Sequence, residues 1–193
     1  MAGDVILGFR PHTYWTPVVA LTGDREEPTV LVRQRLVFAA GAERGVYHQA
    51  AEAVATNAEA LIARVRSAVE ANARSGVAQV VGLLARDGER PAIAVVPTGG
   101  RRTPEQLTDI FRSHTLQHAA EGEFYRDVVA AACVDLGLDV RRPVEGELQA
   151  LACDHLGLDR AALNGKLKAM GSTLGPPWSE DQRLAALAAW LQL

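Results

Sequence analysis

The expected architecture follows from residues 5–38, which read VILGFRPHTYWTPVVALTGDREEPTVLVRQRLVF. Three apolar runs, at 5–9, 15–21 and 29–38, are separated by turn-forming and charged residues. The third run alternates loosely between apolar and basic side chains, which is the period of a half-buried strand. Because short connections join the three runs, the segment predicts three antiparallel strands in a meander.

After these strands the periodicity of the sequence becomes helical. Apolar residues on one stripe predict a helix over about 47–73, ended by Ser75-Gly76. The valine-rich run 77–85 is almost wholly apolar and predicts a strand buried on both faces. For residues 92–96 the pattern leaves open whether they form a further strand or extend the sheet.

The second half of the chain predicts helices around one short strand. Residues 103–106 combine an N-cap threonine, a proline and a capping-box glutamine, so a helix is expected to begin there and run toward residue 119, then continue to 136 after a bend. A second capping box at 179–182 begins a final helix that ends near residue 191. Apolar spacing and glycine stops predict a strand at 139–144 and helices at 147–155 and 160–170.

This order of elements predicts an α/β protein with a mixed sheet covered by helices, formed by residues 1–193 as one domain. The 193 residues are 48% hydrophobic and carry a formal charge of −3. This negative charge argues against a protein whose whole surface binds phosphate groups. Two cysteines exclude a disulfide scaffold. No apolar run reaches 18 residues and the N-terminus lacks signal-peptide character, so a cytoplasmic protein without a membrane partner is expected.

Three parts of the sequence resemble a known family. Residues 6–11, Ile-Leu-Gly-Phe-Arg-Pro, resemble the opening strand of the RuvC-type Holliday-junction resolvases, which have an aspartate at the position of Arg10. Residues 120–140 are similar to their second helix and following strand, and residues 184–188 to their final helix. The chain also resembles a group of bacterial proteins that share its His-Ala-Ala-Glu-Gly-Glu and Pro-Pro-Trp segments.

The resemblance implies a ribonuclease H-like fold, with an antiparallel meander extended by parallel strands and helices on both faces. It also implies binding or processing of structured DNA or RNA. Nucleases of this fold hold two divalent cations, Mg²⁺ or Mn²⁺, between carboxylates on the first strand, the fourth strand and the last helix.

The sequence departs from that metal-binding pattern at decisive positions. Arg10 replaces the first aspartate, and the predicted strand 77–85 contains no acid. On the final helix, Glu180 and Arg183 align with the two expected acids, and a slip of one residue would bring in Asp181. Glu180 and Asp181 are adjacent, so their side chains point about 100° apart on a helix. The standard two-metal site is therefore predicted to be absent, and activity as a metal-dependent nuclease is left open.

The two arginines suggest an anion site in its place. We expect Arg10 and Arg183 to converge and to grip phosphate, because a guanidinium can bind phosphate in a bidentate manner. The carboxylates expected around them, as counter-charges or catalytic groups, are Glu121, Glu123 and Asp181. Glu180 is a further candidate counter-charge. The alternative is that Arg10 is a turn residue and Arg183 a solvated one.

Three further residues are candidates for contacts with nucleic acid or another anion. Arg101 and Arg102 lie in a glycine-containing loop before a predicted helix N-terminus, where free N–H groups favour anions. His12 lies beside aromatic residues that could stack on a base. A simple loop, and packing at the edge of the core, are the respective alternatives.

A second candidate site consists of His114, His118 and Glu121, which share one helix face. Histidines four residues apart can share a transition metal. Seven residues span ~10.5 Å of helix, so the three side chains cannot all reach one ion at ~2.1 Å, and other ligands must come from elsewhere. Alternatively, His118 and Glu121 form an acid–base pair, or the group is a set of solvated polar residues.

Three function hypotheses follow. The first is a RuvC-like protein that binds or processes structured nucleic acid. The second is a non-enzymatic scaffold of the same fold that binds a protein partner or forms a homodimer, which the missing acids and the negative charge favour. The third is a metal-dependent hydrolase built around His114, His118 and Glu121.

Overall fold

The computed structural model describes residues 4–39, 45–53, 55–172 and 174–193. In the described part, the strands β1 (Val5–Phe9), β2 (Trp15–Gly23), β3 (Pro28–Val37), β4 (Pro91–Val95) and β5 (Asp139–Arg141) form one mixed sheet. Their order is β3-β2-β1-β4-β5. β1 and β2 are antiparallel, as are β2 and β3, whereas β4 is parallel to β1 and β5 to β4. The predicted meander extended by parallel strands is therefore confirmed.

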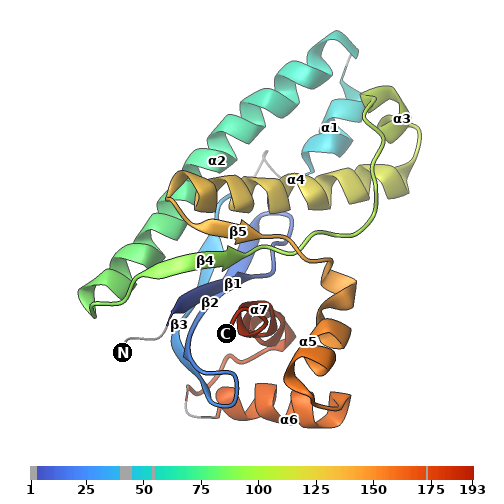
Figure 1. Cartoon of the computed structure of the whole chain (residues 1–193). Coiled ribbons are helices and arrows are strands. Elements are labelled where there is room, and N and C mark those ends of the chain that lie inside the picture. The colour runs from blue at the N-terminus through green and yellow to red at the C-terminus, as the bar shows by residue number, and fades with distance from the viewer. Residues whose placement is uncertain (1–3, 40–44, 54, 173) are drawn as a thin grey trace.

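Helices cover both faces of this sheet (Figure 1). One face carries α1 (Val46–Glu52), α2 (Ala55–Arg86), α3 (Leu107–Phe111) and α4 (His114–Asp135). The other carries α5 (Leu148–Leu156), α6 (Arg160–Met170) and α7 (Glu180–Trp190), preceded by the 3₁₀ turn η2 (Glu145–Glu147). No helix in the described ranges is both long enough and apolar enough to cross a membrane.

The expected strand at 77–85 is wrong, because this segment is the last part of the 32-residue helix α2. Burial along this segment follows the helical period. Val77, Val80 and Leu84 are buried, whereas the residues between them are exposed or half-buried. The predicted helix stop at Ser75-Gly76 is wrong for a related reason. Gly76 faces the side chain of Leu36 in β3, so the helix passes over the sheet there without ending.

The start of the helical half also differs from expectation. The predicted helix over 47–73 is divided into α1 and α2, and Val54 between them lies outside the described residues. The question left open for residues 92–96 is resolved, since β4 occupies 91–95 beside β1.

The capping box expected at 103–106 does not begin a helix. α3 begins only at Leu107, and its N-cap, Gln106, makes no side-chain cap. α4 begins after Ser113, whose hydroxyl accepts a hydrogen bond from the Leu116 N–H, and it runs without interruption through Gly122. Residues 103–105 instead line a surface pocket, so the local signature is overridden by the path that the chain takes out of β4.

The remaining predicted elements lie close to their expected positions. α5, α6 and α7 match the predictions, and the capping box of Ser179 and Gln182 is present at the start of α7. The strand expected at 139–144 is shorter: β5 ends at Arg141, and Val144 forms an isolated parallel bridge with Thr98.

The core is divided into two layers by the sheet, and β1 belongs to both. Val5, Leu7 and Phe9 pack into the layer under α2 and α4. Ile6 packs into the layer that contains α7. Gly8 also faces α7, where an added Cβ would lie 1.9 Å from the carbonyl oxygen of Ala185. The sequence thus brings the end of β1 directly against the last helix.

Candidate functional site

The carboxyl ends of β1, β4 and β5 meet at one edge of the sheet, and a group of paired charges lies there. Arg10, which follows β1, donates from Nε to Oε1 of Glu145 over 3.0 Å. Its Nη1 donates to Oδ1 of Asp181 in the first turn of α7. Arg126 of α4 donates to the second oxygen of Glu145 over 2.9 Å, and His12 Nε2 lies 3.0 Å from Asp181 Oδ1. These five residues, named below the edge cluster, form one chain of contacts in which Arg126, Glu145, Arg10 and Asp181 alternate in charge and His12 lies at the end.

Two members of the edge cluster, Glu145 and Arg10, have shifted pKa values, and each shift favours the charged form of the side chain. Burial alone would raise the pKa of Glu145, but the hydrogen bonds and charges of Arg126 and Arg10 outweigh it and lower that pKa. Burial likewise opposes the charge of Arg10, yet Glu145 and Asp181 raise its pKa. The guanidinium of Arg10 is therefore held permanently between two carboxylates.

Arg183 takes a different place from the one expected. Its Nη1 donates to the carbonyl oxygen of Trp178 over 3.1 Å, which fixes the loop before α7. The counter-charges of Arg10 are Glu145 and Asp181, so of the expected carboxylates only Asp181 meets it. Besides Arg126, sequence reasoning missed Glu145. Glu145 comes just after β5, and β5, β4 and β1 run parallel, so the residues that follow these strands lie at the same edge of the sheet. This is the signal that could have identified Glu145.

His12 is held by stacking as well as by Asp181. Its ring lies 4.3 Å from that of Trp15 with an interplanar angle of 10°. The guanidinium of Arg35 in β3 lies 3.9 Å from the Trp15 ring centroid. Trp15, one of the aromatic residues expected to be able to stack on a base, is thus already in contact with a histidine and an arginine within the protein.

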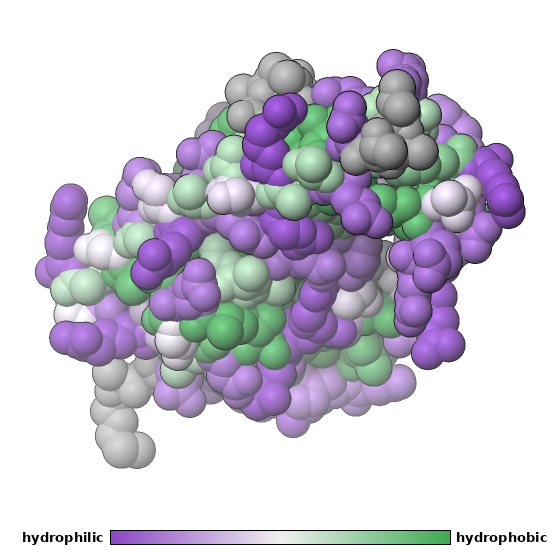
Figure 2. Space-filling model, turned by 90° about the horizontal axis from the view of Figure 1, so that it is seen from above, coloured by the Kyte–Doolittle hydropathy of each residue, from purple (hydrophilic) through white to green (hydrophobic). Residues whose placement is uncertain are grey.

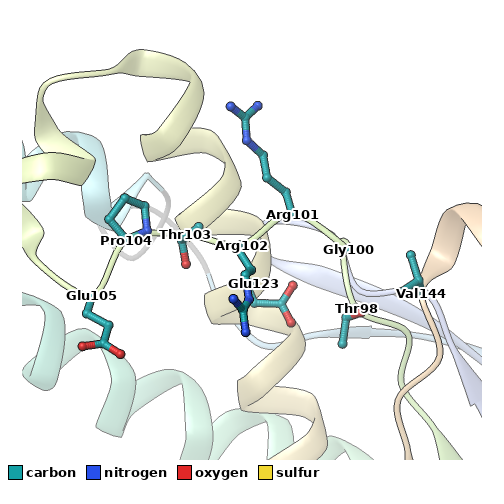
Figure 3. Close-up of a pocket in the computed structure, with 9 residues that line it drawn as sticks. All are labelled: Thr98, Gly100, Arg101, Arg102, Thr103, Pro104, Glu105, Glu123 and Val144. Atoms are coloured by element: carbon teal, nitrogen blue, oxygen red, sulfur yellow. The ribbon is translucent and has the colours of Figure 1, made fainter.

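Glu123 and the two loop arginines lie around a neighbouring pocket of about 740 Å³ (Figure 3). Glu123 accepts from the Gly99 N–H over 3.0 Å and from Arg142 over 2.9 Å. Arg101 and Arg102 are both exposed, and neither has a partner within the described residues; Figure 3 shows Arg101 pointing away from the protein. The residues that line the pocket are Thr98, Gly100, Arg101, Arg102, Thr103, Pro104, Glu105, Glu123 and Val144.

The pocket and the edge cluster are continuous through the backbone. The Glu145 N–H donates to the carbonyl oxygen of Thr98 over 2.9 Å, so the loop that carries Arg101 and Arg102 begins beside Glu145. Gly99, Arg126 and Glu145 also line a second cavity of about 490 Å³ together with Glu180. The whole edge therefore presents exposed cations on one side and a neutralised charge cluster on the other.

The histidine group lies elsewhere, between α1 and α4. His114 and His118 are neighbours on α4, with ring centroids 4.3 Å apart, as their spacing predicts. The third histidine is His48 of α1, whose ring lies 5.0 Å from His114 and 4.6 Å from His118. Sequence reasoning missed His48, because nothing local indicates that α1 packs on α4.

Glu121 is not a neighbour of Arg10 but the anchor of α1. It is 3% exposed, and its carboxylate accepts from the N–H groups of Val46 at 2.7 Å and Tyr47 at 3.2 Å. One oxygen also lies 3.2 Å from Nδ1 of His48. The expected acid–base pair is thus corrected, since Glu121 pairs with His48 instead of His118.

Comparisons with known proteins identify the fold. No protein-family model matches the chain, and no curated protein matches it. Among solved structures, Thermus thermophilus RuvC superimposes with a TM-score of 0.54 at 12% identity, covering 97% of this chain and 92% of that one. T. thermophilus RuvC in complex with a Holliday junction substrate gives a TM-score of 0.51 at 14% identity, covering 97% and 91%. The chain therefore has a RuvC-like, ribonuclease H-like fold.

The residues at the sheet edge do not fit the two divalent cations that this fold implies. β4 carries no acidic residue, and both Glu145 and Asp181 are engaged by the Arg10 guanidinium. A cation bound between those carboxylates would have to displace a permanent positive charge.

Proposed function

We propose that this protein binds structured nucleic acid, a branched DNA above all, along the loop 98–105 and the adjoining sheet edge, and that it does so without two-metal cleavage. The observation that carries the proposal is the arrangement of arginines at this edge. Arg10 is neutralised by two carboxylates, whereas Arg101 and Arg102 are exposed on the rim of a pocket. Support for the ligand class comes from the fold, since one structural neighbour is RuvC in complex with a Holliday junction substrate.

The predicted roles of the cationic residues are revised accordingly. Arg101 and Arg102 contact phosphates, because exposed guanidinium groups release counterions when they bind a nucleic-acid backbone. Arg10 and His12 hold the shape of the edge from within, and Arg183 holds the loop before α7. Glu123 shapes the pocket wall through Gly99 and Arg142.

Binding of a four-way DNA junction tests the proposal. We expect the Arg101→Ser/Arg102→Ser double variant to lose at least about tenfold in affinity and to reduce the slope of log K against log salt by about two, because two phosphate contacts are removed. The matched control is Arg64→Ser/Arg74→Ser, which removes two exposed arginines from α2. Fluorescence anisotropy at several salt concentrations measures both quantities.

The same experiment includes incubation with Mg²⁺ and with Mn²⁺, in which we expect the junction to remain intact. Cleavage that is lost in Asp181→Asn would overturn the non-cleaving part of the proposal. Equal binding by the double variant and the control would overturn the placement of the interface.

A non-enzymatic scaffold is the second candidate function. The neutralised edge cluster favours it, because a self-satisfied group of charges needs no ligand. If the protein does not bind the junction at any salt concentration, this reading replaces the first. Its partner is then another protein or a second copy of this chain.

A further inference from the structure

We propose that His48, His114 and His118 bind one divalent first-row transition metal, with Zn²⁺ as the reference ion, at the junction of α1 and α4. The inference is independent of the nucleic-acid proposal and uses none of its residues. One nitrogen from each ring can be chosen so that the three atoms all lie within 4.8 Å of one another. Three imidazoles at ~2.0–2.1 Å from one tetrahedral ion have nitrogens ~3.4 Å apart, so small side-chain rotations bring them to that geometry.

The hydrogen bonding of His48 prepares it as a ligand. Its Nδ1 lies 3.2 Å from a Glu121 oxygen, and a carboxylate accepts at that distance from a protonated Nδ1. The lone pair of the ring is then on Nε2. That atom is buried and has no hydrogen-bond partner among the described residues. A metal ion gives this nitrogen the partner that the protein does not supply.

Glu121 provides the outer-shell support that metal-bound histidines commonly have. Its carboxylate is itself fixed by the Val46 and Tyr47 N–H groups, so the orientation of the His48 ring is set by the backbone of α1. The other two ligands come from successive turns of α4. The site therefore joins two helices that are separate in the sequence, and Figure 1 shows α1 beside the first half of α4.

The donor set indicates the class of metal. Three neutral imidazoles suit Zn²⁺, Cu²⁺, Ni²⁺ and Co²⁺, whereas Mg²⁺ requires oxygen ligands. His114 and His118 are exposed, so a fourth coordination position faces solvent and is open to water. The site is thus distinct in chemistry and place from the carboxylate sites of nucleases with this fold.

Isothermal titration of the chelator-treated full chain with ZnSO₄ tests the inference. We expect one Zn²⁺ per chain, with affinity reduced at least about 100-fold in His114→Gln and in His118→Gln. Both positions are exposed, so these variants are expected to fold. The matched control is His155→Gln on α5, an exposed histidine outside the group.

Two further measurements complete the test. Co²⁺ should give the visible absorption of a tetrahedral nitrogen site in the wild type and in His155→Gln, but not in His118→Gln. Glu121→Gln should weaken Zn²⁺ binding by about 10- to 100-fold, as loss of an outer-shell carboxylate does. A stoichiometry near zero, or equal affinity in His114→Gln and His155→Gln, would overturn the inference without touching the nucleic-acid proposal.

Discussion

Glu145 accepts hydrogen bonds from two arginines, one on each carboxylate oxygen. Its side chain is 20% exposed, so the ion pairs are only partly screened by water. The charges of Arg10 and Arg126 lower its pKa below the ordinary value of 4.5, although burial acts in the opposite direction. A group whose pKa is lower in the folded state stabilises the protein above its unfolded-state pKa, and that stability is lost as the pH falls.

The pH dependence of unfolding tests this pairing. We expect the free energy of unfolding of the wild type to fall as the pH decreases below about 4.5 and through the folded-state pKa of Glu145. In Glu145→Gln this part of the dependence should be smaller, and stability at pH 7 should fall by about 1–3 kcal/mol because two arginines lose a charged partner. Urea titrations from pH 3 to 7 measure both. Glu147→Gln, an exposed neighbour, serves as the control, and identical pH profiles for the two variants would contradict the prediction.

At the scale of single elements, β1 and α7 pack backbone to backbone at Gly8. A Cβ on Gly8 would lie 1.9 Å from the Ala185 oxygen and 2.8 Å from the Ala189 nitrogen. Both atoms belong to the backbone and cannot rotate away. The small side chains of α7 and the absence of one at Gly8 therefore set how closely the helix approaches the sheet.

Substitution of Gly8 with alanine should consequently destabilise the protein. We expect a loss of about 1–3 kcal/mol or more, since α7 must shift away from β1. Gly82→Ala is the opposite case: this glycine lies on an exposed part of α2 with nothing within 4 Å of an added Cβ. There alanine should stabilise by up to about 1 kcal/mol through helix propensity. Urea unfolding compares the two, and similar effects of both substitutions would argue against the close packing.

Element types were predictable where periodicity and capping agreed. The three meander strands are apolar runs bounded by turn residues, and the helices after residue 147 combine apolar spacing with a glycine stop or a capping box. Both groups lie where they were expected. The strand predicted at 77–85 is wrong because high valine content favours a strand less strongly than spacing favours a helix, and the spacing of the apolar residues is helical. The helix start predicted at 103–106 is wrong because a capping sequence reports only on local structure. The path of the chain beyond β4 depends on distant residues.

On the scale of the whole molecule, the fold places cations and anions from four distant segments at one sheet edge. Arg10 directly follows β1, and the other three residues, Arg126, Glu145 and Asp181, come from α4, η2 and α7. Arg10 bonds to both Glu145 and Asp181, so a cation between these two carboxylates would have to displace it. Viewed from above, polar side chains cover most of the surface, with smaller apolar areas between them (Figure 2).

Replacement of Arg10 should change the metal response of the entire protein. We expect Arg10→Asp to be less stable than the wild type without divalent cations, because three carboxylates then repel one another. Added Mg²⁺ or Mn²⁺ should raise its melting temperature, with little effect on the wild type or on Arg10→Asn. Differential scanning fluorimetry measures the shift. An equal response of all three proteins would show that Arg10 does not control access of cations to the edge.

The candidate sites could be predicted only in part for a physical reason. Residues on one element, such as His114 and His118, have a spacing that can be recognised in the sequence. The partners His48 and Glu145 lie on other elements, and their positions depend on how helices and strands pack. The pairing of Arg10 with Asp181 was within reach because the family resemblance brought the first strand and the last helix together.

The placement of β1 between the two core layers has a consequence for how the protein comes apart. Its odd-numbered side chains pack into the layer under α2 and α4, while Ile6 and the backbone of Gly8 pack against α7. Loss of either layer would expose one face of the same five residues to water. The stability of both layers consequently depends on the same strand. We expect the two layers to unfold together as one cooperative unit, even though their side chains lie on opposite sides of the sheet.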